Sequence, residues 1–184
     1  MSARRMTEPQ RRAADPAASV WVEASAGTGK TQVLTARVLR LLLGGTDPAR
    51  ILCLTFTKAA AAEMHTRIAQ RLGKWAVADD IELTGELAEL EGRRPDAALL
   101  AHARRLFARV LDAPGGLRIM TIHAFCQSIL RRFPLEAGVS PHFTVLDEAA
   151  AEDLMRRARD ALLRSEGPSP AFDDPLQRIT TWIG

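Results

Sequence analysis

A glycine-containing turn near the N-terminus constrains the fold of this chain more than any other feature. It reads Ala24-Ser25-Ala26-Gly27-Thr28-Gly29-Lys30-Thr31. The short apolar run Ser19–Val22 before it predicts a buried strand, and the Leu-, Val- and Ala-rich segment Gln32–Leu43 after it predicts a helix. Strand, glycine-rich turn and helix in this order are typical of a phosphate-binding loop.

The individual positions of this loop have predicted roles. The usual pattern is a glycine, four residues and then Gly-Lys-Ser/Thr; Ala24 replaces the first glycine and the last three positions fit. Gly27 and Gly29 let the backbone curl so that its N–H groups face the phosphates. Lys30, the predicted catalytic residue, reaches the β- and γ-phosphates, and the Thr31 hydroxyl binds Mg²⁺. The predicted phosphate site is Ala24, Ser25, Ala26, Gly27, Thr28, Gly29, Lys30 and Thr31.

Composition limits the class of protein. The chain has 184 residues, of which 47% are hydrophobic, which suits one domain of ordinary size with a real core. No apolar stretch approaches the ~18 residues of a membrane helix, so no membrane partner is expected. Cys53 and Cys126 are far apart and fit no metal or disulfide pattern; both are predicted to be core thiols, and a reducing cytoplasm is the expected location.

The charge of the chain is unevenly distributed. Residues 1–134 hold 20 Lys and Arg against 13 Asp and Glu, whereas residues 135–184 hold 5 against 9. A basic N-terminal part is compatible with binding to nucleic acid.

The rest of the chain alternates apolar runs with helical patterns, which predicts an α/β fold with a parallel sheet. An acidic segment, Asp79–Pro95, is broken by Gly85 and resembles an insertion between core elements. The predicted elements are a strand buried on both faces at Ile51–Phe56, a helix at Lys58–Lys74 capped by Thr57, a helix at Ala97–Leu111, a strand at Leu117–Ile122, a helix at His123–Phe133, and a helix at Glu148–Arg164 capped by Asp147.

Ligands of such sheets bind at the carboxyl ends of the strands. Three segments follow predicted strands and are therefore the candidates for a site: Ala24–Thr31, Thr55–Lys58 and Thr121–Phe125. Threonine hydroxyls and backbone N–H groups there suit phosphates, and Phe56 and Phe125 could stack on bases. Phe125 fits a core position equally well, and His123 could simply cap a helix.

These segments resemble motifs of the superfamily 1 DNA helicases, the UvrD-like group. Ala24–Thr31 is similar to motif I of that family, in which alanine often comes first. Leu54–Met64, reading LTFTKAAAAEM, is similar to motif Ia, and Met120–Phe125 is similar to motif Ib. Gln10, within Thr7–Ala13, resembles the glutamine motif. Within the family the chain is most similar to the AddA-like helicase-nuclease subunits.

The resemblance implies an incomplete P-loop NTPase (RecA-like) α/β fold, in which helices flank a parallel sheet. It implies a flexible N-terminus with the glutamine motif at 1–15 and a partial first RecA-like ATP-binding domain at 16–146. That domain would contain a helical insertion at about 75–112. Residues 147–184 would begin an accessory helical region and end in a loose tail.

The resemblance also implies ligands and partners. Gln10 would select adenine, which makes ATP and Mg²⁺ the expected cofactors. Single-stranded and duplex DNA are the expected substrates, and a second helicase-nuclease subunit is an expected partner of the full-length protein. The implied DNA-binding residues are Thr55, Phe56, Thr57, Lys58, Thr121, His123 and Phe125.

The implied activity is ATP-driven translocation on single-stranded DNA with strand separation, in double-strand break repair and recombination. No acidic motif follows the third predicted strand, and no second RecA-like domain or nuclease domain is evident. The chain is therefore expected to be the N-terminal part of a longer motor that binds nucleotide weakly and hydrolyses little alone.

Other interpretations of the pattern remain open. A P-loop kinase for a small acceptor is one alternative, and a non-catalytic module that binds nucleotide or single-stranded DNA is another. Thr144–Glu148 looks like an acidic Mg²⁺-binding segment, but Asp147 as a helix cap explains it as well.

Overall fold

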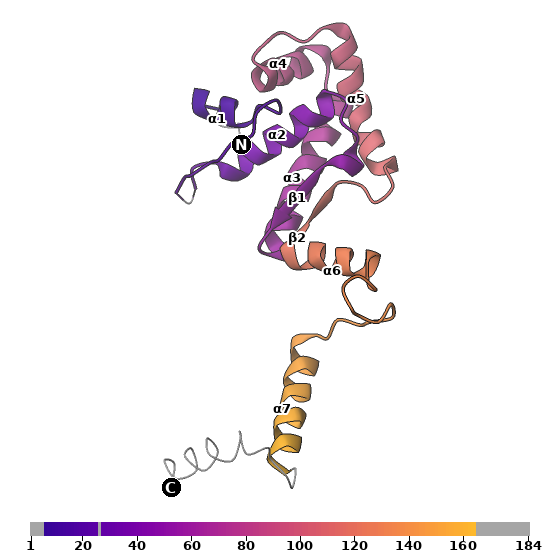
Figure 1. The fold of residues 1–184 in the computed structure, drawn as a ribbon. Helices are drawn as coiled ribbons and strands as arrows, with labels where there is room; N and C mark the ends of the chain where they lie inside the picture. Colours follow the sequence, from indigo (N-terminus) through magenta and orange to yellow (C-terminus); the bar gives the residue numbers. More distant parts are fainter. Residues whose placement is uncertain (1–5, 26, 165–184) are drawn as a thin grey trace. The chain divides into compact units, whose positions relative to one another are not determined.

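The computed structural model describes residues 6–25 and 27–164, which divide into two compact units between Arg132 and Phe133 (Figure 1). In chain order the elements are α1 (Glu8–Ala13), α2 (Lys30–Leu43), the 3-10 helix η1 (Pro48–Arg50), β1 (Leu52–Thr55), α3 (Lys58–Val77), α4 (Asp80–Glu91), α5 (Ala97–Asp112), β2 (Arg118–Thr121), α6 (Ile122–Arg132) and α7 (Glu148–Arg164). The α/β class predicted from the sequence is confirmed, and most helices lie within a few residues of their predicted bounds.

The sheet of the first unit consists of two strands, β1 and β2, within the described residues. They pair in parallel, with Leu52 opposite Arg118 and Thr55 opposite Thr121. The long helix α3 follows β1 and packs against both strands. Because both strands run the same way, the segments that follow them, Thr55–Lys58 and Thr121–Phe125, meet at one edge of the sheet, as predicted.

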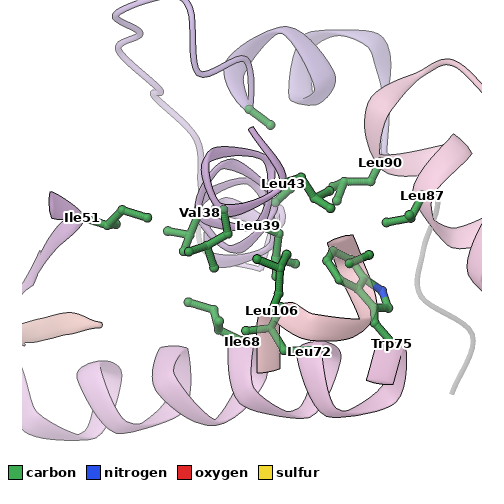
Figure 2. Close-up of a cluster of buried hydrophobic side chains, with 14 of the residues drawn as sticks. Val38, Leu39, Leu43, Ile51, Ile68, Leu72, Trp75, Leu87, Leu90 and Leu106 are labelled. Carbon is green, nitrogen blue, oxygen red and sulfur yellow. The ribbon is translucent and has the colours of Figure 1, made fainter. Parts of the chain in front are cut away.

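The core lies mainly between helices. Figure 2 shows α2 at the centre of this core, where the side chains of Val38, Leu39 and Leu43 extend toward α3, α4 and α5. The largest fully buried side chains are Leu39 and Leu42 of α2, Ile68, Leu72 and Trp75 of α3, Leu83, Leu87 and Leu90 of α4, and Leu106 of α5. Residues 75–112, predicted to be a helical insertion, therefore supply a large part of this core.

The prediction that β1 is buried on both faces is wrong. Leu52 and Leu54 are 44% and 45% exposed, whereas Cys53 packs against the core from the opposite face. Successive side chains of a strand point to opposite faces, so the apolar run fills one covered face and one that the described residues leave open. Burial also raises the pKa of the Cys53 thiol.

The predicted strand at Ser19–Val22 is not formed. These described residues have no regular structure, and Val20, Trp21 and Val22 are 47%, 90% and 43% exposed. Val20 and Val22 line one side of an open cavity of about 490 Å³, and Val33 and Leu34 of α2 lie among the residues across it. A strand requires a neighbouring strand for its backbone hydrogen bonds, and β1 and β2 pair only with each other among the described residues.

The prediction that Gly85 breaks the acidic segment is also wrong, because Gly85 lies inside α4. Asp79 caps this helix by accepting the Glu82 N–H at 2.8 Å, and Leu83, Leu87 and Leu90 supply a buried stripe. One glycine costs a helix only about 1 kcal/mol relative to alanine, which burial of three leucines outweighs.

Gly85→Ala is expected to raise the free energy of unfolding by about 0.5–1 kcal/mol. The position is exposed, and a Cβ there would meet nothing within 4 Å. Gly92→Ala is the matched control of opposite sign. Gly92 ends α4 with φ of +74°, where an alanine costs roughly 1–2 kcal/mol. Urea unfolding curves measure both, and a loss of stability in Gly85→Ala would contradict the packing of α4.

A cluster of charged side chains joins α3 to α4. The Trp75 indole N–H donates to Glu86 at 2.8 Å, and the Lys74 ammonium contacts Glu82 at 2.8 Å and also Glu86. Burial raises the pKa of Glu86, but hydrogen bonds from Lys74 and Trp75 and the charge of Arg71 outweigh it, so the pKa of this carboxyl lies below its ordinary value.

Glu86→Gln is expected to lower the free energy of unfolding at pH 7 by roughly 1 kcal/mol. A carboxyl with a lowered folded pKa contributes fully above its unfolded value, near 4.5, and loses that contribution as the pH falls through the folded pKa. The difference between the two proteins should therefore shrink below pH 4.5. Glu82→Gln, whose side chain is 49% exposed, should show a smaller effect. A difference independent of pH would contradict this role for the Glu86 charge.

In the second unit, the predicted cap of α7 is confirmed. The Asp147 carboxylate accepts the Ala150 N–H at 2.8 Å, which satisfies one of the free N–H groups at the start of the helix. Within the described residues, no helix is long and apolar enough to cross a membrane.

Candidate functional site

The glycine turn bends sharply where it leads into α2. Gly27 and Gly29 have φ of +79° and +95°, a region that residues with a side chain rarely adopt, and Gly29 is the residue before the first turn of the helix. The Val33 N–H donates to the Gly29 carbonyl at 3.0 Å and begins the helical ladder, so the N–H groups that precede it lack an intrahelical partner. Ala26, predicted to belong to the loop, lies outside the described residues.

Side chains of the loop fold back onto its own backbone. The Lys30 ammonium donates to the carbonyl oxygens of Ala24 and of Ser25, the latter at 2.8 Å. The Thr28 hydroxyl donates to the same Ser25 oxygen at 2.7 Å. Lys30 is exposed and Thr31 is half-buried in the first turn of α2. A positive charge, curled backbone and a helix N-terminus thus converge on one point, an arrangement that suits a phosphate group.

Gln10 contacts this loop directly. Its amide nitrogen donates to the Thr28 carbonyl at 3.0 Å, and its amide oxygen accepts the Thr7 N–H at 2.9 Å. The structure therefore brings together the predicted glutamine motif and the predicted phosphate loop, 18 residues apart in sequence.

Arginines of α2 hold the N-terminal segment in place, a role that the sequence pattern did not indicate. Arg37 donates to the carbonyl oxygens of Ala13 at 3.4 Å, of Asp15 and of Ala18 at 2.7 Å. Arg40 donates to the Arg11 carbonyl at 3.3 Å. The only signal in the sequence was an arginine seven residues after Lys30 in an otherwise apolar helix. These contacts explain why residues 6–15, expected to be flexible, include α1.

The second group of predicted residues lies at the carboxyl edge of the sheet. Thr55 and Thr121 are opposite each other in the strand register. Thr57 and Thr121 cap the helices that follow their strands, because their hydroxyl oxygens accept the N–H groups of Ala60 at 3.1 Å and Ala124 at 3.2 Å. A hydroxyl that accepts in this way keeps its hydrogen for another partner, such as a phosphate oxygen.

Exposed side chains surround this edge. Phe56, directly after β1, is 88% exposed, and Lys58 and His123 are exposed as well, while Phe125 is half-buried. An aromatic ring this exposed contributes little to the core and is free to stack on another ring. The predicted DNA-binding residues therefore form one surface, with Phe125 as its least accessible member.

The structure does not join the two groups by hydrogen bonds. In the described residues, those of the loop go to its own backbone and to Gln10, and none reaches Thr55–Lys58 or Thr121–Phe125. Cys126, predicted to be core, is exposed on α6, because a three-residue shift on a helix moves a side chain to a neighbouring position around it. Among the described residues no cluster of metal-binding side chains is present.

The fold and the site define an α/β protein with a parallel pair of strands, a glycine-rich loop that opens a helix, and a polar edge where two strand-to-helix turns meet. A family model described as the UvrD/REP helicase N-terminal domain matches residues 6–172. The chain belongs to this family, as its resemblance to the UvrD-like group predicted.

Curated relatives agree with this assignment, and all those compared are named as ATP-dependent helicase/nuclease subunits. The protein of Lactobacillus gasseri is 38% identical over 163 residues, which is 87% of this chain and 12% of that protein. The protein of Desulforudis audaxviator is 36% identical over 187 residues, 98% of this chain and 12% of that protein. The protein of Bacillus licheniformis is 34% identical over 167 residues, 88% of this chain and 12% of that protein. The chain therefore spans about an eighth of the length of these relatives.

Proposed function

We propose that the chain is the N-terminal ATP-binding part of an ATP-dependent single-stranded-DNA translocase and helicase that acts in double-strand break repair and recombination. The observation that carries the proposal is the exposed Lys30 ammonium at the start of α2, beside backbone curled by two glycines with positive φ. Membership of the UvrD/REP family and the names of the relatives support a motor of this class.

In this proposal the fold is a partial P-loop, RecA-like domain. Gly27–Lys30 hold the phosphates of ATP and the Thr31 hydroxyl holds the Mg²⁺ bound to them, while the ion supplies charge stabilisation to the triphosphate. The donors present fit such a group: an exposed ammonium, a hydroxyl in the first helical turn, and N–H groups without an intrahelical partner. Lys30 acts by stabilising charge on the phosphate that is transferred.

The edge of the sheet is the proposed DNA surface. Threonine hydroxyls at Thr55, Thr57 and Thr121 contact phosphates, Lys58 adds positive charge, and Phe56 stacks on bases regardless of their sequence. The name of the relatives describes a helicase/nuclease with more than one chain, so we propose a cytoplasmic location and a second, partner chain for the whole protein.

The isolated chain is proposed to bind nucleotide weakly and to hydrolyse little, because phosphoryl transfer requires several charged groups acting together. The test is a titration of the chain with a fluorescent ATP analogue and Mg²⁺, with and without a single-stranded oligonucleotide. Phosphate release is then measured on the same samples.

Saturable nucleotide binding with little release, together with oligonucleotide binding, is the expected result. DNA-stimulated release would mean that this chain carries more of the motor than proposed. Transfer to a small acceptor without DNA dependence would favour a P-loop kinase, and binding without turnover in the full-length protein would favour a non-catalytic module. Failure to bind any triphosphate would contradict the proposed function of the loop.

A further inference from the structure

The amide group of Gln10 is engaged by the protein at both ends. Its oxygen accepts the Thr7 N–H at 2.9 Å at the start of α1, and its nitrogen donates to the Thr28 carbonyl at 3.0 Å in the glycine turn. The oxygen and the nitrogen of an amide are its two recognition groups, so each end of Gln10 already has a partner. This arrangement ties α1 to the loop.

The approach of Gln10 to the loop is close. A Cβ placed on Gly29 would lie 3.1 Å from the Gln10 amide nitrogen, closer than such contacts normally are. Gly29 therefore serves two purposes: it allows a φ of +95°, and it leaves room for the glutamine. On the other side of Thr28, its hydroxyl donates to Ser25, which also accepts from Lys30. Gln10 thus contacts a residue that shares a hydrogen-bond partner with the phosphate-binding lysine.

The helix that carries Gln10 is itself anchored to the helix that the loop opens. Arg37 of α2 binds the carbonyl oxygens of Ala13, Asp15 and Ala18, and Arg40 binds that of Arg11. The result is a closed circuit: from α1 through Gln10 to the loop, along α2, and back through Arg37 to α1. Such a circuit restricts the positions that the Thr28 carbonyl and the neighbouring N–H groups can take.

We propose that Gln10 is a positioning residue that holds the phosphate loop in its curled shape through the Thr28 carbonyl, with Arg37 as the anchor of its helix. This inference rests on the proposed triphosphate site and adds a role that does not depend on the base of the nucleotide. Preorganised N–H groups bind an anion better because less conformational freedom is lost on binding.

The test compares the wild-type chain with Gln10→Met, which keeps the length of the side chain and removes both hydrogen bonds. ATP, GTP and inorganic tripolyphosphate, each with Mg²⁺, are used to displace a fluorescent ATP analogue. Positioning predicts that Gln10→Met weakens all three competitors to the same extent, roughly three- to tenfold, the equivalent of about one hydrogen bond. Gln70→Met, an exposed glutamine on α3, is the matched control and should leave all three unchanged.

A loss confined to ATP, with GTP and tripolyphosphate unchanged, would overturn the inference, because it would show that Gln10 reads the base. The proposed function would survive that result. If the wild-type chain binds none of the three, the triphosphate site itself is wrong and both proposals fall.

A second measurement does not need a ligand. Amide hydrogen exchange of Gly27–Thr31 should become faster in Gln10→Met, whereas exchange in the middle of α5 should change only as much as the global free energy of unfolding. Arg37→Met should accelerate exchange in the loop and also in α1. Unchanged exchange in the loop of Gln10→Met would overturn the positioning role even if nucleotide binding were reduced.

Discussion

Lys30→Ala is expected to lose nucleotide binding while it keeps its fold. Lys30 is one of three lysines in the chain and the only one in the glycine turn. Hydrogen bonds to charged groups contribute about 1.5–3 kcal/mol, so the loss corresponds to roughly 10- to 150-fold weaker binding of the triphosphate. Because the side chain is exposed, the free energy of unfolding should change by less than ~0.5 kcal/mol.

The measurement is a titration with a fluorescent ATP analogue, paired with a urea unfolding curve of the same variant. Lys58→Ala is the reciprocal variant: it should weaken oligonucleotide binding and leave the affinity for the ATP analogue without DNA as it was. In a full-length relative, the variant corresponding to Lys30→Ala should lose ATP hydrolysis. Wild-type hydrolysis by that variant would refute the assignment of the loop.

Leu39→Ala is the substitution expected to affect stability most. Leu39 is fully buried at the centre of the core, where α2 faces the other helices (Figure 2). Replacing a buried leucine by alanine removes its transfer free energy and leaves a cavity, at a cost of about 2–5 kcal/mol. Since domains of this size have only about 5–15 kcal/mol of stability, a large fraction of it would be lost.

Leu34→Ala is the control in the same helix. Leu34 is 52% exposed, so its loss should cost less than about 1 kcal/mol. The two variants should differ in the urea concentration at the midpoint of unfolding and should share the same slope. Equal midpoints would mean that α2 does not pack as described. Nucleotide affinity of the folded fraction should remain unchanged in both.

Helices with a cap and a buried stripe could be predicted from the sequence. Thr57 and Asp147 were identified as caps because their side chains precede helix-forming runs, and the structure shows both accepting the expected N–H groups. These signals are local, since the cap and the N–H that it satisfies lie three residues apart.

Pairing and packing partners could not be predicted in the same way. Ser19–Val22 has the composition of a strand, but a strand depends on a neighbour that the pattern does not contain. The exposure of Leu54 depends equally on what covers that face of the sheet. The contact of Gln10 with Thr28 depends on how α1 is held by Arg37, through backbone carbonyls that no residue pattern encodes.

The register of the sheet has a consequence for the order of folding. Leu52 and Arg118, which face each other in β1 and β2, are separated by 66 positions, and the intervening chain consists largely of α3, α4 and α5. Contacts within that helical segment span shorter loops and cost less closure entropy. The helices should therefore consolidate first and the strands should join last, so that the Thr55–Thr121 edge is completed only late in folding. Pulse-labelled hydrogen exchange should show protection of α3 and α5 before β1 and β2, and simultaneous protection would exclude this order.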